Sequence, residues 1–239
     1  MRTANECASQ ENCVTCSWRQ NQWFCGLSEA GLRPFQRIAL PRTQPAGAVL
    51  YAEGHAADGI FVLCNGRAKI SISSRRGSVV ILKVAEAGEA LGLEAVLAHR
   101  PHEETAELLD SCQIKFIPKH DLRAFLAEQP EAALRAAHQL NVNCRSAREQ
   151  IRHIGFSVSG SEKLTRLLVT WASAGKTNRH QERIVQVPFT HQEIAQMIGS
   201  TRETITRVLN HWKRERIIEI SGKTLIVKNM EELERLAHE

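Results

Sequence analysis

The segment FTHQEIAQMIGSTRETITRVLNHWKRE, residues 189–215, contains two short helical patterns separated by one glycine. Thr190 is followed three residues later by Glu193, a capping box in which the two residues satisfy each other's free backbone donors at a helix start. The glycine is predicted to end this helix. Ser200, with Glu203 three residues on, is then predicted to begin the next helix in the same way. The segment therefore predicts two helices joined by a tight turn, which is a helix-turn-helix.

The second of these helices has an apolar stripe and a polar face. Apolar residues recur at helical spacing, namely Ile205, Val208, Leu209 and Trp212. In a helix-turn-helix the second helix enters the DNA major groove, where arginine can bond guanine in a bidentate manner and glutamate can accept from cytosine N4. The residues expected to contact DNA are Thr190, Ser200, Arg202, Glu203, Thr206 and Arg207. The alternative interpretation is a solvated amphipathic helix with ordinary charge pairs.

This helix resembles the DNA-reading helix of the Crp–Fnr family of bacterial transcription regulators. In that family an R-E-T-x-x-R run reads an operator half-site, and RETITR stands at residues 202–207 here. The preceding THQEIAQMIG resembles the family's first helix. The resemblance implies a homodimer that binds an inverted repeat in double-stranded DNA and works with RNA polymerase. Because Arg202 precedes Glu203, the half-sites are expected to resemble TGTGA rather than the TTGAT associated with FNR.

The composition is that of an ordinary globular protein. A length of 239 residues with 43% hydrophobic residues allows two domains, and a net charge of +5 is too modest to argue for nucleic acid by itself. There is neither a run of about 18 apolar residues nor a signal-peptide pattern, so we expect a cytoplasmic protein without a membrane partner. We find no P-loop, G-x-S-x-G or H-E-x-x-H motif, so we do not expect an enzyme.

Four of the seven cysteines fall in the first 25 residues with the spacing C-x5-C-x2-C-x8-C, namely Cys7, Cys13, Cys16 and Cys25. In a reducing cytosol such a group favours metal, cluster or redox chemistry over structural disulfides. Four thiolates suit either a tetrahedral zinc ion or a [4Fe–4S] cluster, and the spacing does not choose between them. Unliganded thiols that are prone to oxidation are a further alternative.

Members of the family that resemble FNR carry an N-terminal C-x2-C pair and a further cysteine as ligands of an oxygen-labile [4Fe–4S] cluster. Cys13, Cys16 and Cys25 match this arrangement, with a longer final gap. The resemblance therefore implies a [4Fe–4S] cluster, with zinc as the alternative.

The fourth ligand does not follow from the resemblance. FNR-like proteins take it from a distant strand just before an I-P dipeptide, and this chain has Lys115 at that position. Cys112 lies three residues earlier and would face the opposite side of an uninterrupted strand, so it could serve only through a local bulge. We expect Cys7 to complete the set, with Cys112 as the alternative fourth ligand.

Residues 28–129 are expected to form a β-rich sensory domain. Short β-branched segments separated by turn residues lie at 59–63, 68–72 and 79–84. The pattern resembles the double-stranded β-roll of the cyclic-nucleotide-binding fold. Cyclic-nucleotide binders of the family place an arginine against the phosphate, but this chain has EETA at residues 103–106, so we do not expect a cyclic nucleotide. A different small effector is the alternative signal. Cys64 is interpreted as a core or turn thiol.

Residues 130–156 predict a long helix with a heptad seam of small and apolar side chains. The seam consists of Ala133, Ala137, Leu140, Cys144, Ala147, Ile151 and Ile154. It resembles the dimerisation helix of the family, and its small side chains suit a close but weak contact. The alternative is packing of this stripe on the chain's own sensory domain.

The expected fold class is α+β, with four parts along the chain. These are a cysteine-rich segment (1–27), the β-roll (28–129), the dimerisation helix (130–156) and a winged helix-turn-helix (157–239). Ser161 is predicted to open the first helix of the last part. A strand–turn–strand pattern at 217–227 predicts the wing, with Lys223 at its tip to meet a phosphate.

Overall fold

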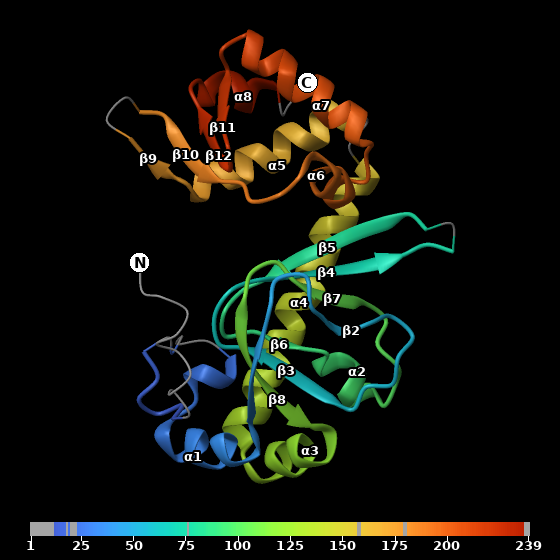
Figure 1. The fold of residues 1–239 in the computed structure, drawn as a ribbon, viewed down its shortest axis with the longest axis vertical. Helices are drawn as coiled ribbons and strands as arrows, with labels where there is room; N and C mark the ends of the chain where they lie inside the picture. Colours follow the sequence, from blue (N-terminus) through green and yellow to red (C-terminus); the bar gives the residue numbers. More distant parts are fainter. Residues whose placement is uncertain are drawn as a thin grey trace. The chain divides into compact units, whose positions relative to one another are not determined.

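The computed structural model describes residues 12–17, 19, 23–75, 77–156, 159–178 and 181–236 (Figure 1). The chain forms two compact units, Met1–Ala147 and Arg148–Glu239. The boundary between them falls within one continuous helix, α4 (Pro130–Phe156). Within the described ranges, no helix is both long and apolar enough to cross a membrane.

The first unit contains two four-stranded antiparallel sheets, with strand orders β1-β8-β3-β6 and β2-β7-β4-β5. The strands are β1 (Leu40–Gln44), β2 (Val49–Tyr51), β3 (Gly59–Leu63), β4 (Ala68–Ser73), β5 (Val79–Ala85), β6 (Ala90–Leu91), β7 (Thr105–Leu108) and β8 (Cys112–Pro118). Two short helices accompany them, α2 (Leu93–Ala98) and α3 (Lys119–Glu128). The three predicted segments are confirmed as β3 and as parts of β4 and β5.

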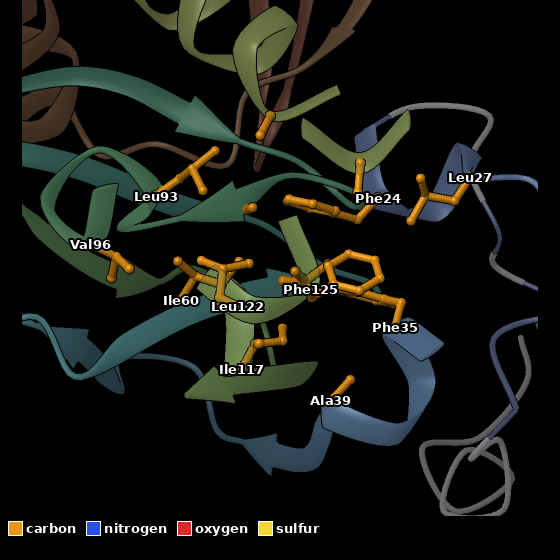
Figure 2. Packing of buried hydrophobic residues seen from close by; sticks show 14 of the residues in the cluster. Phe24, Leu27, Phe35, Ala39, Ile60, Leu93, Val96, Ile117, Leu122 and Phe125 are labelled. Atoms are coloured by element: carbon orange, nitrogen blue, oxygen red, sulfur yellow. The ribbon is translucent and has the colours of Figure 1, made fainter. Parts of the chain in front are cut away.

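Alternate side chains of β3 and β8 enter two separate hydrophobic clusters. Ile60 of β3 and Ile117 of β8 belong to the first cluster, which Figure 2 shows, and Val62 belongs to it as well. Leu63 and Ile114 belong to the second cluster. Because successive side chains on a strand point to opposite faces, this division fixes which residues of β3 and β8 share a face.

The chain enters the first unit through a short 3-10 helix, η2 (Trp23–Gly26), followed by α1 (Glu29–Ile38). Phe24 and Leu27 are completely buried in the first cluster, and the Phe24 ring stacks on Phe35 with centroids 5.5 Å apart (Figure 2). Ser28 caps α1 by accepting from the Gly31 amide. Packing on the sheet therefore anchors the segment that directly follows the N-terminal cysteines.

The long helix α4 has the predicted bounds. Its buried face consists of Ala132, Ala136 and Gln139. The side-chain amide of Gln139 makes two hydrogen bonds to Ala90 of the β-roll. Its nitrogen donates to the Ala90 carbonyl at 2.6 Å, and its oxygen accepts from the Ala90 amide at 3.1 Å. The face that packs on the sensory domain is thus displaced by one residue from the predicted seam.

The second unit is a winged helix-turn-helix. Its helices are α5 (Gly160–Ala174), α6 (His191–Ile198), α7 (Arg202–Arg214) and α8 (Met230–Leu236). Its antiparallel sheet has the order β11-β12-β10-β9, with β9 (Lys176–Thr177), β10 (Arg183–Gln186), β11 (Ile218–Ser221) and β12 (Thr224–Val227). The predicted start of α5 at Ser161 is wrong, because Ser159 provides the cap by accepting from the Glu162 amide at 3.1 Å.

Candidate DNA-binding and thiol sites

The helix-turn-helix begins with the predicted capping box. The Thr190 hydroxyl accepts from the Glu193 amide at 3.2 Å, and the Glu193 carboxylate accepts from the Thr190 amide at 2.9 Å. Gly199 ends α6 in the left-handed conformation with φ 60°, which glycine adopts without a steric penalty. The first helix and its termination are therefore confirmed.

The predicted cap of the second helix was wrong by one residue. The Ser200 amide still donates to the Ala195 carbonyl at 2.9 Å, so Ser200 completes the turn that closes α6. Thr201 is the cap of α7, and its hydroxyl accepts from the Thr204 amide at 3.2 Å. The turn therefore contains one residue more than the capping-box pattern suggested.

The two faces of α7 are as predicted. Its buried residues are Ile205, Val208, Leu209 and Trp212. Arg202, Glu203 and Arg207 are exposed, while Thr206 is half-buried and its hydroxyl lies 2.9 Å from His191 Nδ1. Sequence reasoning missed His191, because its partner lies on the other helix, 15 positions away. This contact fixes one face of the predicted reading helix to α6.

The wing forms as a hairpin in which Ser221 pairs with Thr224. Gly222, at φ +58°, and Lys223 make the two-residue turn. The Lys223 side chain is exposed, while its carbonyl accepts from the Val187 amide at 2.7 Å. The predicted tip residue is thus held by its backbone and presents its ammonium to solvent.

The three described N-terminal cysteines, Cys13, Cys16 and Cys25, are half-buried, and the described cysteines form no disulfide. Cys13 and Cys25 pack against the first hydrophobic cluster. The Cys13 amide donates to the Gln36 side chain at 3.1 Å, and the Arg19 guanidinium donates to the Cys25 carbonyl at 3.0 Å. Among the residues the structure describes, no three His, Cys, Asp or Glu side chains are arranged to hold a metal ion. Cys7 lies outside the described residues.

Two residues linked to these cysteines, by contact or by charge, were not predicted as site residues. Lys115 is only 6% exposed, and its ammonium donates to Cys13 Sγ at 2.8 Å. Cys64 directly follows β3, and burial raises the pKa of its thiol to about 12. The Lys115 charge opposes this increase, and the thiols of Cys25, Cys13 and Cys16 add to it. From its position at a strand end Cys64 was interpreted as a core or turn thiol, and the sequence has no local signal for the pairing of β3 with β8.

Cys112 is placed away from the N-terminal cysteines. It is 1% exposed, belongs to the second hydrophobic cluster, and donates from Sγ to the Asp110 carbonyl at 3.2 Å. β8 pairs with β1 and β3 in continuous register, without the bulge that its use as a ligand would require. The structure therefore does not bring Cys112 together with the three N-terminal thiols.

The segment after Cys25 is attached to the first turns of α4. The Ser28 amide donates to both Glu131 carboxylate oxygens, at 3.1 and 3.2 Å, and the Ser28 hydroxyl donates to Glu131 at 2.7 Å. The Ser28 hydroxyl bond is the main cause that lowers the pKa of Glu131. The Trp23 ring lies against His138, with centroids 5.4 Å apart. A change in the cysteine segment thus has a direct route to α4.

Much of the predicted dimer seam is exposed in the single chain. Ala137, Cys144, Ala147 and Ile151 are exposed, the last by 67%. Ala133 and Leu140 are half-buried, and Leu140 packs against the first cluster. Leu134, which the heptad pattern did not select, is 73% exposed. Ile154 lies in α4, but its side chain is outside the described part.

A pocket of about 580 Å³ lies between the β-roll and the first-unit part of α4. Its charged lining residues are Lys83, Glu94, Arg100, Glu103 and Glu104. Lys83 pairs with Glu89, and the Glu104 carboxylate accepts from the Tyr51 hydroxyl at 2.8 Å. Burial raises the pKa of Glu104. The pocket therefore has three carboxylates in its wall, and its lysine is already paired.

Two domain families match the chain. A Crp-like helix-turn-helix domain matches residues 162–236, and a cyclic nucleotide-binding domain matches residues 41–129. The CRP-like cAMP-activated global transcriptional regulator of Mycobacterium tuberculosis is 22% identical over 215 residues, which cover 90% of this chain and 95% of that protein.

Solved structures show the same fold. FixK2 from Bradyrhizobium japonicum has a TM-score of 0.70 at 18% identity, over 83% of this chain and 97% of that one. The c-di-GMP responsive global regulator CLP from Xanthomonas campestris has a TM-score of 0.75 at 17% identity, over 84% and 99%. Regulators of this type bind DNA and typically act as dimers. The chain thus belongs to the Crp–Fnr family and is a sequence-specific DNA-binding transcription regulator rather than an enzyme.

Proposed function

We propose that this regulator responds to oxygen or nitric oxide through a [4Fe–4S] cluster held by its N-terminal cysteines. The observation that carries the proposal is the link between the cysteine segment and α4. Ser28, three residues after Cys25, bonds Glu131 in the first turn of that helix through three hydrogen bonds. A signal at the cysteines would therefore act on the helix that carries the seam.

The residues present suit such a cofactor. Thiolates are soft ligands, and the C-x2-C pair of Cys13 and Cys16 can hold adjacent corners of a cluster. The three described thiols are only half-buried, which leaves a path for a small oxidant. A cluster bound here would supply an iron–sulfur centre that reacts with oxygen or nitric oxide. A tetrahedral zinc ion is the alternative occupant.

The chain's own residues would convert ligation into DNA binding. With the thiolates held together, the segment through Phe24 and Leu27 stays packed on the first cluster, and Ser28 stays bonded to Glu131. This favours the position of α4 that presents Ala137, Cys144 and Ile151 to a second copy. A weak seam of small side chains suits a switch, because a few kcal/mol then shift the dimer equilibrium.

On DNA, we assign base reading to the polar face of α7. Arg202 and Arg207 read guanines, Glu203 reads a cytosine, and Thr206 contacts a base edge or methyl group. A twofold dimer places two such helices one DNA turn apart, so the operator is an inverted repeat with TGTGA-like half-sites. RNA polymerase is the expected partner at the promoter. Operator selection from random DNA that shows no guanine preference in the half-sites would contradict the assignment.

The cluster is tested on protein purified without oxygen. We expect broad absorption near 400 nm that bleaches in air, with about four irons and matching acid-labile sulfide per chain. Replacing the four N-terminal cysteines by serine should weaken both dimerisation and operator binding. The coupling would be wrong if sedimentation and DNA titration were unchanged in that variant.

A second candidate is a regulator gated by a small effector, with zinc or no metal at the cysteines. The pocket of about 580 Å³ favours it, because Leu140, Cys144 and Ala147 of α4 line its wall. Carboxylates of Glu94, Glu103 and Glu104 in that wall oppose a cyclic phosphate diester and suit a neutral or cationic molecule. An effector that raises the melting temperature of iron-free protein would support this candidate.

A further inference from the structure

The geometry points to Cys64 as the fourth thiolate ligand of the centre that Cys13, Cys16 and Cys25 begin. This inference rests on the proposed function and names a ligand for it. The family resemblance places that ligand on β8, and the sequence favoured Cys7, with Cys112 as the alternative. The structure instead places Cys64, which directly follows β3, on the face of the β-roll against which Cys13 and Cys25 pack.

The strand register places Cys64 on the correct face. Val62 pairs with Lys115 across β3 and β8, and the Cys64 amide continues this pairing by donating to the Gln113 carbonyl at 2.8 Å. Residues two apart on an extended chain share a face, so Cys64 follows Val62, a member of the first hydrophobic cluster. Cys13 and Cys25 pack against that same cluster.

Lys115 connects the two groups of thiols. It lies opposite Val62 on the same face, and its ammonium donates to Cys13 Sγ at 2.8 Å. Cys64 lies on that face two residues after Val62, so Lys115 connects the strand position of Cys64 to Cys13. Cys64 is thus the described β-roll cysteine on the face that Lys115 connects to Cys13.

The charge of Lys115 suits a ligated centre. A buried ammonium is costly unless an anionic partner compensates for it, and four thiolates around a cluster carry net negative charge. By resemblance, the family has its ligand at the Lys115 position. In this chain we assign the ligand to Cys64, directly after the neighbouring strand β3. Lys115, at the family's ligand position on β8, then supplies a positive charge that balances the thiolates.

Cys112 provides a matched control. It lies on β8 and is more buried than Cys64, but its thiol faces the second cluster. Substituting it perturbs packing without reaching the N-terminal thiols. Loss of iron in a Cys64 variant but not in a Cys112 variant would therefore report ligation rather than a weakened sheet.

The experiment compares full-length wild type with Cys64→Ser, Cys64→Ala, Cys112→Ser and Cys7→Ser, all purified without oxygen. Iron, acid-labile sulfide and the visible spectrum are measured, with circular dichroism to confirm folding. Replacing a residue that only hydrogen-bonds a metal ligand lowers metal affinity about 10–100-fold. Loss of a ligand itself should therefore leave Cys64→Ala with well under half the wild-type iron. The serine variant keeps the size of the side chain, so it tests ligation where alanine disturbs folding.

We expect Cys7→Ser and Cys112→Ser to retain wild-type iron while both Cys64 variants lose it. A wild-type cluster that persists in folded Cys64→Ser and Cys64→Ala, with an unchanged rate of bleaching in air, would overturn the assignment of Cys64 and leave the cluster proposal standing. Wild-type protein without iron and sulfide would instead remove the proposed function, and the assignment with it.

Discussion

The helix-turn-helix and the cysteine segment differ in the range of the contacts that hold them. Thr190 and Glu193 bond across three residues, as do Thr201 and Thr204. The cysteine segment is held by Lys115 with Cys13, 102 positions apart, and by Ser28 with Glu131, 103 positions apart. The reading helix is therefore specified largely by its own segment, whereas the thiol site depends on the folded β-roll.

This difference suits the DNA reading and the signal sensing that we propose for these two regions. A reading helix must present the same side chains to DNA in every state, and local caps with a buried stripe keep it rigid. A sensor must respond, and a segment fixed by a few distant contacts can be released without unfolding the sheet below it.

Removing a buried aromatic anchor should have the largest effect, confined to its own unit. Phe24→Ala deletes a fully buried ring from the first cluster, and Trp212→Ala removes a ring on the buried face of α7 that is 2% exposed. Each should cost about 3–5 kcal/mol of local stability. Hydrogen exchange of the full chain should show faster exchange in η2 and α1 for the first variant, and in α6 and α7 for the second. Identical exchange maps for the two variants would break the comparison.

Arg207→Ala should weaken operator binding by about 1–3 kcal/mol and relax specificity at one base pair, because arginine bonds guanine in a bidentate manner. Lys223→Ala is the matched control at the wing, and it should weaken all sequences evenly and lower the salt dependence. Titration of operator and scrambled DNA at two salt concentrations measures both effects. Equal losses on both DNAs for Arg207→Ala would rule out base reading by this residue.

Thr201→Ala should cost about 1 kcal/mol, because it removes the hydroxyl that caps α7. Ser200→Ala should change stability by only a few tenths of a kcal/mol, since Ser200 contributes its backbone amide to the turn. Urea unfolding of the two variants measures the difference. A larger cost at Ser200 would place the cap where the sequence pattern first put it.

The smallest expected effect is a pH dependence of the link between Ser28 and Glu131. Hydrogen bonds from Ser28 lower the pKa of Glu131 in the folded chain, so their stabilisation is present above the ordinary value of 4.5 and is lost as pH falls through the depressed pKa. Glu131→Gln should flatten this part of the curve of melting temperature against pH. A curve that matches wild type would show that the link contributes nothing measurable.

The sequence by itself determined the elements whose signals are local. Three features of the helix-turn-helix could be predicted, because each depends on residues within a few positions of one another. They are the Thr190–Glu193 box, the glycine after α6 and the apolar stripe of α7 opposite Arg202 and Arg207. The bounds of α4 and the strand at residues 59–63 were readable for the same reason. The cap of α7 was nevertheless predicted one residue too early, because the pattern from Ser200 to Glu203 does not reveal that Ser200 still belongs to the turn.

Only the tertiary structure decided which side chains meet at the thiol site. The place of Cys64 on the same face as Lys115, whose ammonium contacts Cys13, arises from the register of β3 against β8. The same alternation turned Cys112 toward the second cluster. A shift of one residue in register moves a side chain to the opposite face, and long-range strand pairing sets that register. Local sequence patterns therefore do not encode it.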